Sequence, residues 1–238
     1  MKNIFWILFL LTASVAFCQN NEEEFLKGNK FYSEGKYQDA LNCYSSIDLK
    51  GQAVWFNMGN TFFKMKRYPA ALLSWKRAYK QSSFNQLQSI EKNISVLNEK
   101  LGNSEDTIWG QFFSFICRYS FLFSTLVFQL LFLLFWFLLI IFFRRFWRED
   151  KFIYLLFLLL INILLAEFIF AKYSIYANNH AIVMKNVDVL AGPGDKFHKL
   201  FELKAASEVD ILDSANQWTK CRKNGLIGWI QSEIIKMF

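Results

Sequence analysis

The sequence is poor in the residue types on which metal sites, redox centres and most active sites depend. Its 238 residues include 2 His, 4 Cys and 2 Pro. His180 and His198 have no cysteine or pair of carboxylates at the spacing of metal ligands. We therefore expect no metal ion, and we expect Cys43 and Cys221 to be buried and unreactive. The cysteines, at positions 18, 43, 117 and 221, form no C-x-x-C motif.

Motifs for nucleotide binding and for acyl transfer are missing as well. No glycine-rich loop that follows a strand ends in Lys-Ser or Lys-Thr, so no phosphate cradle is indicated. No nucleophile elbow occurs, and Gly192-Pro-Gly is typical of a turn. These absences predict a protein that is not an enzyme and binds no cofactor.

Positive charge is not concentrated as nucleic-acid binding requires. The net charge of +7 comes from 27 Lys and Arg against 20 Asp and Glu, and the surplus is spread along the chain. The one local concentration, at 144–151, has four basic and two acidic residues. A protein that binds phosphate backbones needs a dense basic face, so we expect no nucleic acid as a partner.

Long hydrophobic runs are abundant, since 54% of the residues are hydrophobic and 28 are Phe. Residues 120–143 carry no charge, and residues 152–171 carry only Glu167. A helix of ~24 residues at ~1.5 Å per residue reaches ~36 Å, more than the ~30 Å hydrocarbon core of a bilayer. The sequence therefore predicts two transmembrane helices joined by the basic loop at 144–151.

The basic loop also predicts the topology. Four basic residues between two spans place residues 144–151 in the cytoplasm by the positive-inside rule, so the segments on either side lie outside it. Residues 1–18 resemble a secretory signal peptide, with cleavage before Gln19; an uncleaved anchor and a lipid on Cys18 are the alternatives. Both arguments predict a two-span protein of a bacterial inner membrane, with its N-terminal and C-terminal domains in the periplasm.

Two polar side chains lie within the predicted spans. In a helical hairpin centred near residues 147–148, Gln129 and Glu167 lie at the same depth, because their positions sum to 296. A hydrogen bond between them would reduce the free-energy cost of a carboxyl group in lipid. The alternative is that Glu167, about one turn from Lys172, extends to the outer surface of the membrane.

Residues 19–104 contain an internal repeat. A shift of 31 residues superposes aromatic, glycine, asparagine and alanine positions in the same order, which is typical of stacked helical hairpins. Small residues let two helices approach closely, and aromatic residues fill the space around them. The positions expected to pack the repeats are Gly28, Tyr37, Ala40, Gly59, Tyr68, Ala71 and Trp75.

These residues resemble the tetratricopeptide repeat family, whose usual period of about 34 residues is slightly longer. The resemblance implies that the first helix of each hairpin lines a groove for a partner peptide, and that residues 84–101 cap the stack. Phe25 stands where family members that clamp a carboxylate have Lys, which favours an apolar or aromatic-rich peptide. The alternative is that the two hairpins merely cover each other. The groove would include Phe25, Asn29, Tyr32, Phe56, Asn60 and Phe63.

Residues 172–238 change to short alternating strands separated by turns, about five in all. Their motifs resemble those of bacterial SH3-like domains, with a Gly-Pro pair, a central Trp and a closing G-x-x-G-W. The resemblance implies a small β-barrel that binds peptidoglycan or another protein. A structural plug at the membrane surface is the alternative. The matching residues are Gly192, Pro193, Trp218, Gly228 and Trp229.

The predicted fold is a multi-domain membrane protein with α-helical tetratricopeptide hairpins, a two-helix transmembrane hairpin and a small SH3-like β-barrel. This order resembles the BatE proteins of the Bacteroides aerotolerance group, found in Bacteroidota. That resemblance implies a scaffold whose partners are membrane-anchored von Willebrand A-domain proteins and a MoxR-type ATPase. A cell-wall tether or envelope sensor acting through the SH3-like domain is the alternative. The expected bounds are 1–18 for the signal peptide, 19–104 for the repeats, 105–119 for a linker, 120–143 and 152–171 for the spans, 144–151 for the loop and 172–238 for the barrel.

Overall fold

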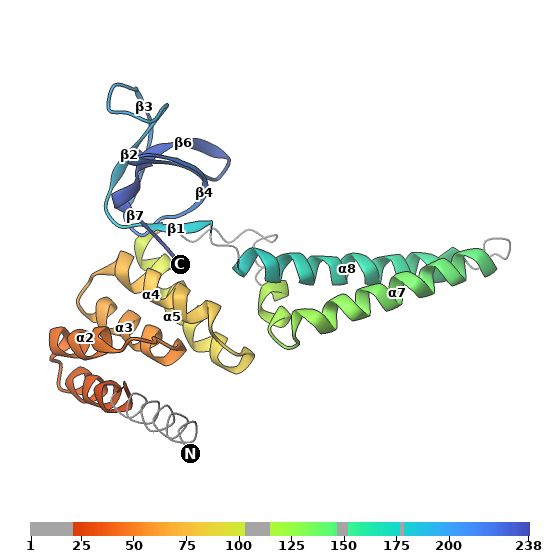
Figure 1. Ribbon diagram of the computed structural model, residues 1–238, viewed down its shortest axis with the longest axis horizontal. Coiled ribbons are helices and arrows are strands. Elements are labelled where there is room, and N and C mark those ends of the chain that lie inside the picture. Colours follow the sequence, from red (N-terminus) through yellow and green to blue (C-terminus); the bar gives the residue numbers. More distant parts are fainter. Residues whose placement is uncertain (1–20, 103–114, 147–151, 177–178) are drawn as a thin grey trace, which may run out of the picture. The chain divides into compact units, whose positions relative to one another are not determined.

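The computed structural model describes residues 21–102, 115–146, 152–176 and 179–238 (Figure 1). The chain divides into two compact units, of which the first combines Met1–Gln81 with Asn179–Phe238 and the second comprises Ser82–Asn178. The expected signal peptide, residues 105–114 of the expected linker and residues 147–151 of the expected loop lie outside the described residues.

The helical part of the first unit consists of two helical hairpins. The first pairs a helix at 21–33 with α2 (Tyr37–Ser46), and the second pairs α3 (Gln52–Lys64) with α4 (Tyr68–Lys80). Gly35 and Lys66, which have φ angles of 76° and 61°, lie at the corresponding turns. Helical hairpins are thus present where the 31-residue repeat predicts them.

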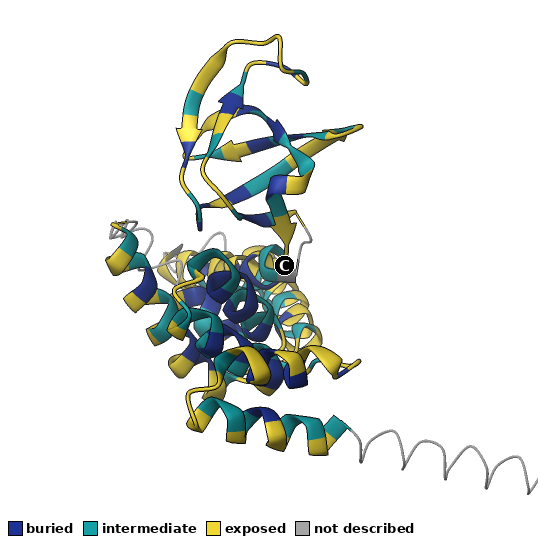
Figure 2. Ribbon diagram, turned by 90° about the vertical axis from the view of Figure 1, so that its left-hand side faces the viewer, coloured by how far each residue is buried: buried dark blue, intermediate teal, exposed yellow. Residues whose placement is uncertain are grey.

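Equivalent close contacts hold each hairpin together. A Cβ atom at Gly28 would lie 2.5 Å from the ring of Tyr44, and one at Gly59 would lie 2.4 Å from the ring of Trp75. Both rings are buried, as are the two repeat alanines, Ala40 and Ala71. In this part of the unit, buried positions face the neighbouring helices (Figure 2). The glycines are therefore required because an aromatic ring occupies the space of their missing side chains.

The rest of the first unit is a seven-stranded antiparallel sheet in the order β3-β2-β6-β5-β4-β1-β7. The expected closed barrel is wrong, since the sheet is open, with β3 and β7 at its edges. The physical reason is that β3 pairs only with β2, while β7 pairs with β1, so the two edges do not meet. The strands are β1 (His180–Val183), β2 (Val187–Leu190), β3 (Lys199–Leu203), β4 (Glu208–Ala215), β5 (Trp218–Lys223), β6 (Leu226–Gln231) and β7 (Ile235–Met237).

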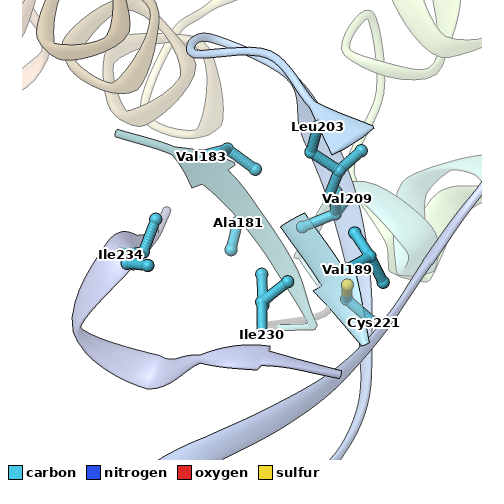
Figure 3. Close-up of a cluster of buried hydrophobic side chains, with 8 residues drawn as sticks. All are labelled: Ala181, Val183, Val189, Leu203, Val209, Cys221, Ile230 and Ile234. Atoms are coloured by element: carbon cyan, nitrogen blue, oxygen red, sulfur yellow. The ribbon is translucent and has the colours of Figure 1, made fainter. Parts of the chain in front are cut away.

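Aliphatic side chains from most of these strands form one core (Figure 3). A Cβ atom at Gly228 would lie 2.3 Å from Val189, so only glycine permits β6 to cross β2 this closely. Trp229 is only half-buried, and the ammonium group of Lys220 lies 5.9 Å from the centre of its ring. The core residues are Ala181, Val183, Val189, Leu203, Val209, Cys221, Ile230 and Ile234.

The second unit contains α5 (Phe84–Leu101), a short helix at 115–120, α7 (Thr125–Phe146) and α8 (Phe152–Tyr176). A capping box of Ser83 and Gln86 begins α5, and Gly102 in a left-handed conformation ends it. The prediction of two helices long and apolar enough to cross a membrane is confirmed for Thr125–Arg145 and Ile153–Ile175. The first begins five residues later than expected, because residues 115–120 form a helix of their own.

Candidate functional site

The two asparagines of the expected groove hold the hairpins together. The hydroxyl of Tyr44 and the side-chain amide of Asn57 each donate a hydrogen bond to Oδ1 of Asn29, both at 2.8 Å. One repeat later, Nε1 of Trp75 donates to Oδ1 of Asn60 at 3.1 Å. Burial raises the pKa of Tyr44 to about 12, so its hydroxyl remains a donor at neutral pH. These hydrogen bonds explain why Asn recurs at this position of the repeat without any need for a bound partner.

Most aromatic residues of the expected groove also pack within their own hairpin. The ring centre of Phe25 lies 6.1 Å from that of Tyr44, and the ring centre of Tyr32 lies 5.6 Å from that of Tyr37. Phe63 lies 5.6 Å from Trp75. The half-buried Phe56 belongs neither to these ring pairs nor to the core of the first hairpin, and it is the groove residue best placed to contact a partner.

A cleft of about 380 Å³ lies on the β-sheet domain, at residues that the sequence did not single out apart from Trp218. Across β2 and β3, Asp188 pairs in register with Glu202, so both carboxylates lie on the same face. The ammonium group of Lys199 lies 2.6 Å from Asp188, whose hydrogen bond raises the pKa of Lys199. The cleft thus combines carboxylates, amides and an indole. Its lining is Asn186, Val187, Asp188, Leu190, Asp195, Glu202, Trp218 and Gln231.

The expected Gly-Pro turn lies beside this cleft. A Cβ atom at Gly192 would lie 2.6 Å from the ring of Phe197, which folds over the glycine, and Pro193 is exposed. Phe197 itself is 47% exposed. The turn therefore presents an aromatic side chain next to Asp195, in the loop where the sequence predicts aromatic binding residues.

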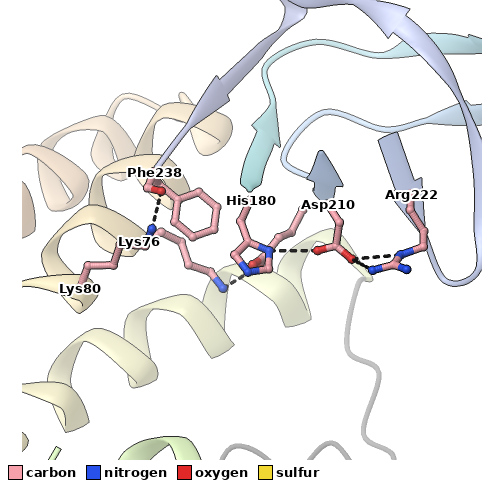
Figure 4. Close-up of polar contacts among 7 residues, drawn as sticks. Lys76, Lys80, His180, Asp210, Arg222 and Phe238 are labelled. Atoms are coloured by element: carbon pink, nitrogen blue, oxygen red, sulfur yellow. Dashed lines mark hydrogen bonds and ion pairs between the residues drawn. The ribbon is translucent and has the colours of Figure 1, made fainter. Parts of the chain in front are cut away.

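Within the first unit, α4 is bonded to the β-sheet domain (Figure 4). Lys76 forms an ion pair with Glu208 at 2.6 Å. Arg77 donates to the carbonyl oxygen of Met237 at 2.9 Å, and Lys80 donates to that of Phe238 at 2.6 Å. Burial lowers the pKa of both Arg77 and Lys80. Three cations of α4 thus contact the sheet domain, at the start of β4, at the end of β7 and at Phe238 just after β7.

Aromatic and charged contacts complete this docking site. The ammonium groups of Lys76 and Lys80 lie 5.6 and 5.4 Å from the ring centre of Phe238. The imidazole of His180 stacks on the same Phe238 ring, with the two ring centres 6.0 Å apart. Its Nδ1 lies 2.9 Å from Oδ1 of Asp210. No pattern in the sequence predicts this site, because the α4 residues lie more than one hundred positions from Glu208, Met237 and Phe238.

The expected intramembrane pair is not formed by the described side chains. The aromatic rings of Phe128 and Phe168, which also sum to 296, stack between α7 and α8 at a distance of 5.3 Å. Gln129 and Glu167 are the adjacent positions, and both side chains are exposed on their helices. At the level of the hairpin expected from the sequence, the residues that face each other are therefore the phenylalanines.

Groups capable of catalysis or metal binding are few in the described part of the chain. Within the described ranges, Cys43, Cys117 and Cys221 are buried and form no disulfide, and burial raises the pKa of Cys221 to about 11. Among the described residues, no group of three His, Cys, Asp or Glu side chains is placed to hold a metal ion.

A scan of protein-family models and a search of curated proteins found no match to this chain.

Replacing Asn29 with Ala should destabilise the helical repeats by about 1–3 kcal/mol, because the buried hydroxyl of Tyr44 loses its acceptor. Thermal and urea unfolding of the detergent-solubilised protein, followed by circular dichroism, measures the change. Asn42→Ala is the matched control, since Asn42 makes only an exposed hydrogen bond with Gln38. Equal midpoints for the two variants would contradict the structural role of Asn29.

Proposed function

We propose that this chain is a non-enzymatic membrane scaffold that presents a helical-repeat module and a β-sheet module in the same compartment. The observation that supports this best is the contact between α4 and the sheet. Lys76 pairs with Glu208, and Lys80 bonds to Phe238, although both apolar helices separate these residues in the sequence. Such contacts within one chain are possible only where an even number of membrane crossings separates the two modules.

Two crossings satisfy this condition. The basic residues between the apolar helices favour a cytoplasmic position for the 144–151 loop. Both modules then face the periplasm of a bacterial inner membrane. The modules are held together by charged contacts, so the protein would act as one platform rather than as two independently tethered domains.

The helix at 21–33 and α3 offer the face expected to meet a protein partner. Because Asn29 and Asn60 are engaged within the hairpins, the half-buried ring of Phe56 is the strongest candidate for a direct contact. The resemblance to BatE proteins implies von Willebrand A-domain proteins and a MoxR-type ATPase as members of the same membrane complex. We propose this assembly as the setting in which the scaffold acts.

The cleft on the sheet favours a second candidate function, a tether or envelope sensor that binds peptidoglycan. Sugar and amino-sugar groups suit a site that combines an indole with carboxylate and amide side chains, because each can stack or form hydrogen bonds. Trp218, Glu202 and Gln231 supply these groups in the cleft. This function would use the sheet, whereas the scaffold function would use the helices.

The topology can be tested with single cysteines at Leu49, Lys185 and Glu149, introduced into a Cys18→Ser background. In intact spheroplasts, a membrane-impermeant maleimide should label positions 49 and 185, and should label position 149 only after permeabilisation. Leu49 is 80% exposed, so burial would not explain failure to react. Protection of either 49 or 185 in intact spheroplasts would overturn the proposed arrangement.

The partner face can be tested by purifying the protein from membranes under mild detergent and quantifying the proteins that co-purify. Phe56→Ala should reduce their recovery several-fold, because it removes the partly exposed ring of the proposed partner face. The thermal midpoint of the variant is measured alongside, so that a loss of recovery can be separated from unfolding. Leu49→Ala removes another exposed apolar side chain and should leave recovery unchanged. If Phe56→Ala retains every partner, this face does not bind them.

The tether can be tested by sedimenting the purified protein with peptidoglycan. Trp218→Ala and Glu202→Gln should each reduce the sedimented fraction, because both residues line the cleft. Glu233→Gln, which removes a highly exposed carboxylate outside the cleft, should not. If the wild-type protein stays in the supernatant, the tether function is excluded and the scaffold function is unaffected.

A further inference from the structure

Residues 115–123, here called the outer segment, fold against α8 immediately before α7 begins. The segment is a helix at 115–120 that continues into a turn, in which the amide of Leu122 donates to Tyr119 at 3.1 Å. Ile116 and Cys117 are buried against Ala171 of α8. One face of the outer segment is therefore fixed to the helical hairpin.

Lys172 fixes the end of the outer segment. Its ammonium group donates to the carbonyl oxygen of Ser120 at 3.1 Å and to that of Phe123 at 2.5 Å. Both Lys172 and Ser120 are buried. The last carbonyl groups of a helix have no partner within the helix, and here a lysine of the neighbouring helix supplies one. The direction of the segment is thus set by α8.

The opposite face of the outer segment is apolar and exposed. Phe115, Tyr119, Leu122 and Phe123 have exposed fractions of 53%, 37%, 48% and 56%. Phe115 and Tyr119, four residues apart, lie on one side of the helix at 115–120, and Leu122 and Phe123 follow in the turn. The exposed apolar surface continues into α7 with Leu126. The exposed apolar side chains of the outer segment are thus continuous with those at the start of α7.

We propose that the outer segment is an interfacial anchor, with this apolar face embedded at the headgroup–acyl boundary of the outer leaflet. The proposal rests on the membrane location proposed above. Phe123 lies two residues before Thr125, the first residue of the apolar span, so lipid at that boundary is the surface within its reach. Trp and Tyr are enriched at this depth, and amphipathic helical segments bind there through their apolar faces.

Arg118 and Tyr119 connect the outer segment to α5. Arg118 lies 3.7 Å from the carboxylate of Glu91, and the ring centre of Tyr119 lies 5.6 Å from that of Phe84. Burial raises the pKa of Glu91, while the charge of Arg118 opposes that change. An anchored outer segment would therefore hold α5 close to the membrane surface instead of leaving it on a free tether.

The proposal can be tested by measuring the depth of nitroxide labels in the full-length protein reconstituted into vesicles of phosphatidylethanolamine and phosphatidylglycerol. Single cysteines at Phe115, Tyr119, Leu122 and Phe123 in the Cys18→Ser background accept the label, while the unsubstituted background shows whether buried thiols react. Collision rates with oxygen, which concentrates in lipid, and with a water-soluble nickel chelate give the depth. Labels at Val96 on α5 and at Leu134 within α7 provide the two references, since both side chains are exposed.

We expect the ratio of oxygen to nickel collisions at the four positions to lie above that at Val96 and below that at Leu134. A ratio equal to that at Val96 would place the outer segment in water and overturn the anchor. Protection from both reagents would mean that protein covers the face, which also overturns it. A water-like ratio at Leu134 would instead refute the membrane span itself, so the two failures are distinguishable.

Discussion

The docking of α4 on the last strand of the sheet is the contact that most constrains how this protein is organised. It joins residues 76–80 to Glu208 and Phe238 by ion-pair, hydrogen-bond and cation–π contacts (Figure 4). Partly buried cations such as Arg77 and Lys80 are costly unless acceptors satisfy them. Carbonyl oxygens at the end of the chain supply those acceptors. A compact unit therefore forms from segments at opposite ends of the sequence.

The helical hairpins show how a binding motif and a packing motif can share residues. Asn29 accepts hydrogen bonds from Tyr44 and Asn57, and Asn60 accepts one from Trp75. A polar side chain so engaged stabilises the hairpin and is less available to a partner. Specificity on this face would then depend on half-exposed aromatic rings such as that of Phe56. On the sheet, by contrast, Asp188 and Glu202 converge around a cleft that offers polar groups directly.

In the hairpin of α7 and α8, lysine and phenylalanine determine the geometry, while the two polar residues expected to do so remain exposed. Phe128 stacks on Phe168 between α7 and α8, and Lys172 satisfies carbonyl groups of the outer segment. Packing of aromatic faces needs no hydrogen-bond partner, so it suits an apolar surrounding. The charge of Lys172 is compensated by backbone oxygens of Ser120 and Phe123 near the C-terminal end of α8. The hairpin thus gains a fixed orientation relative to the residues that precede it.

The sequence by itself determined the helical hairpins and the two long apolar helices, because hydrophobic runs and a 31-residue repeat depend only on neighbouring residues. It also located Gly28, Gly59 and Gly228, since a close approach leaves no other residue possible. It did not predict the short helix at 115–120. It did not determine that the sheet stays open, that Asp188 faces Glu202, or that Lys80 reaches Phe238. Those features depend on strand register and on contacts between residues distant in the sequence. Tertiary structure alone decides them, because many pairings satisfy the same local pattern and only packing selects one.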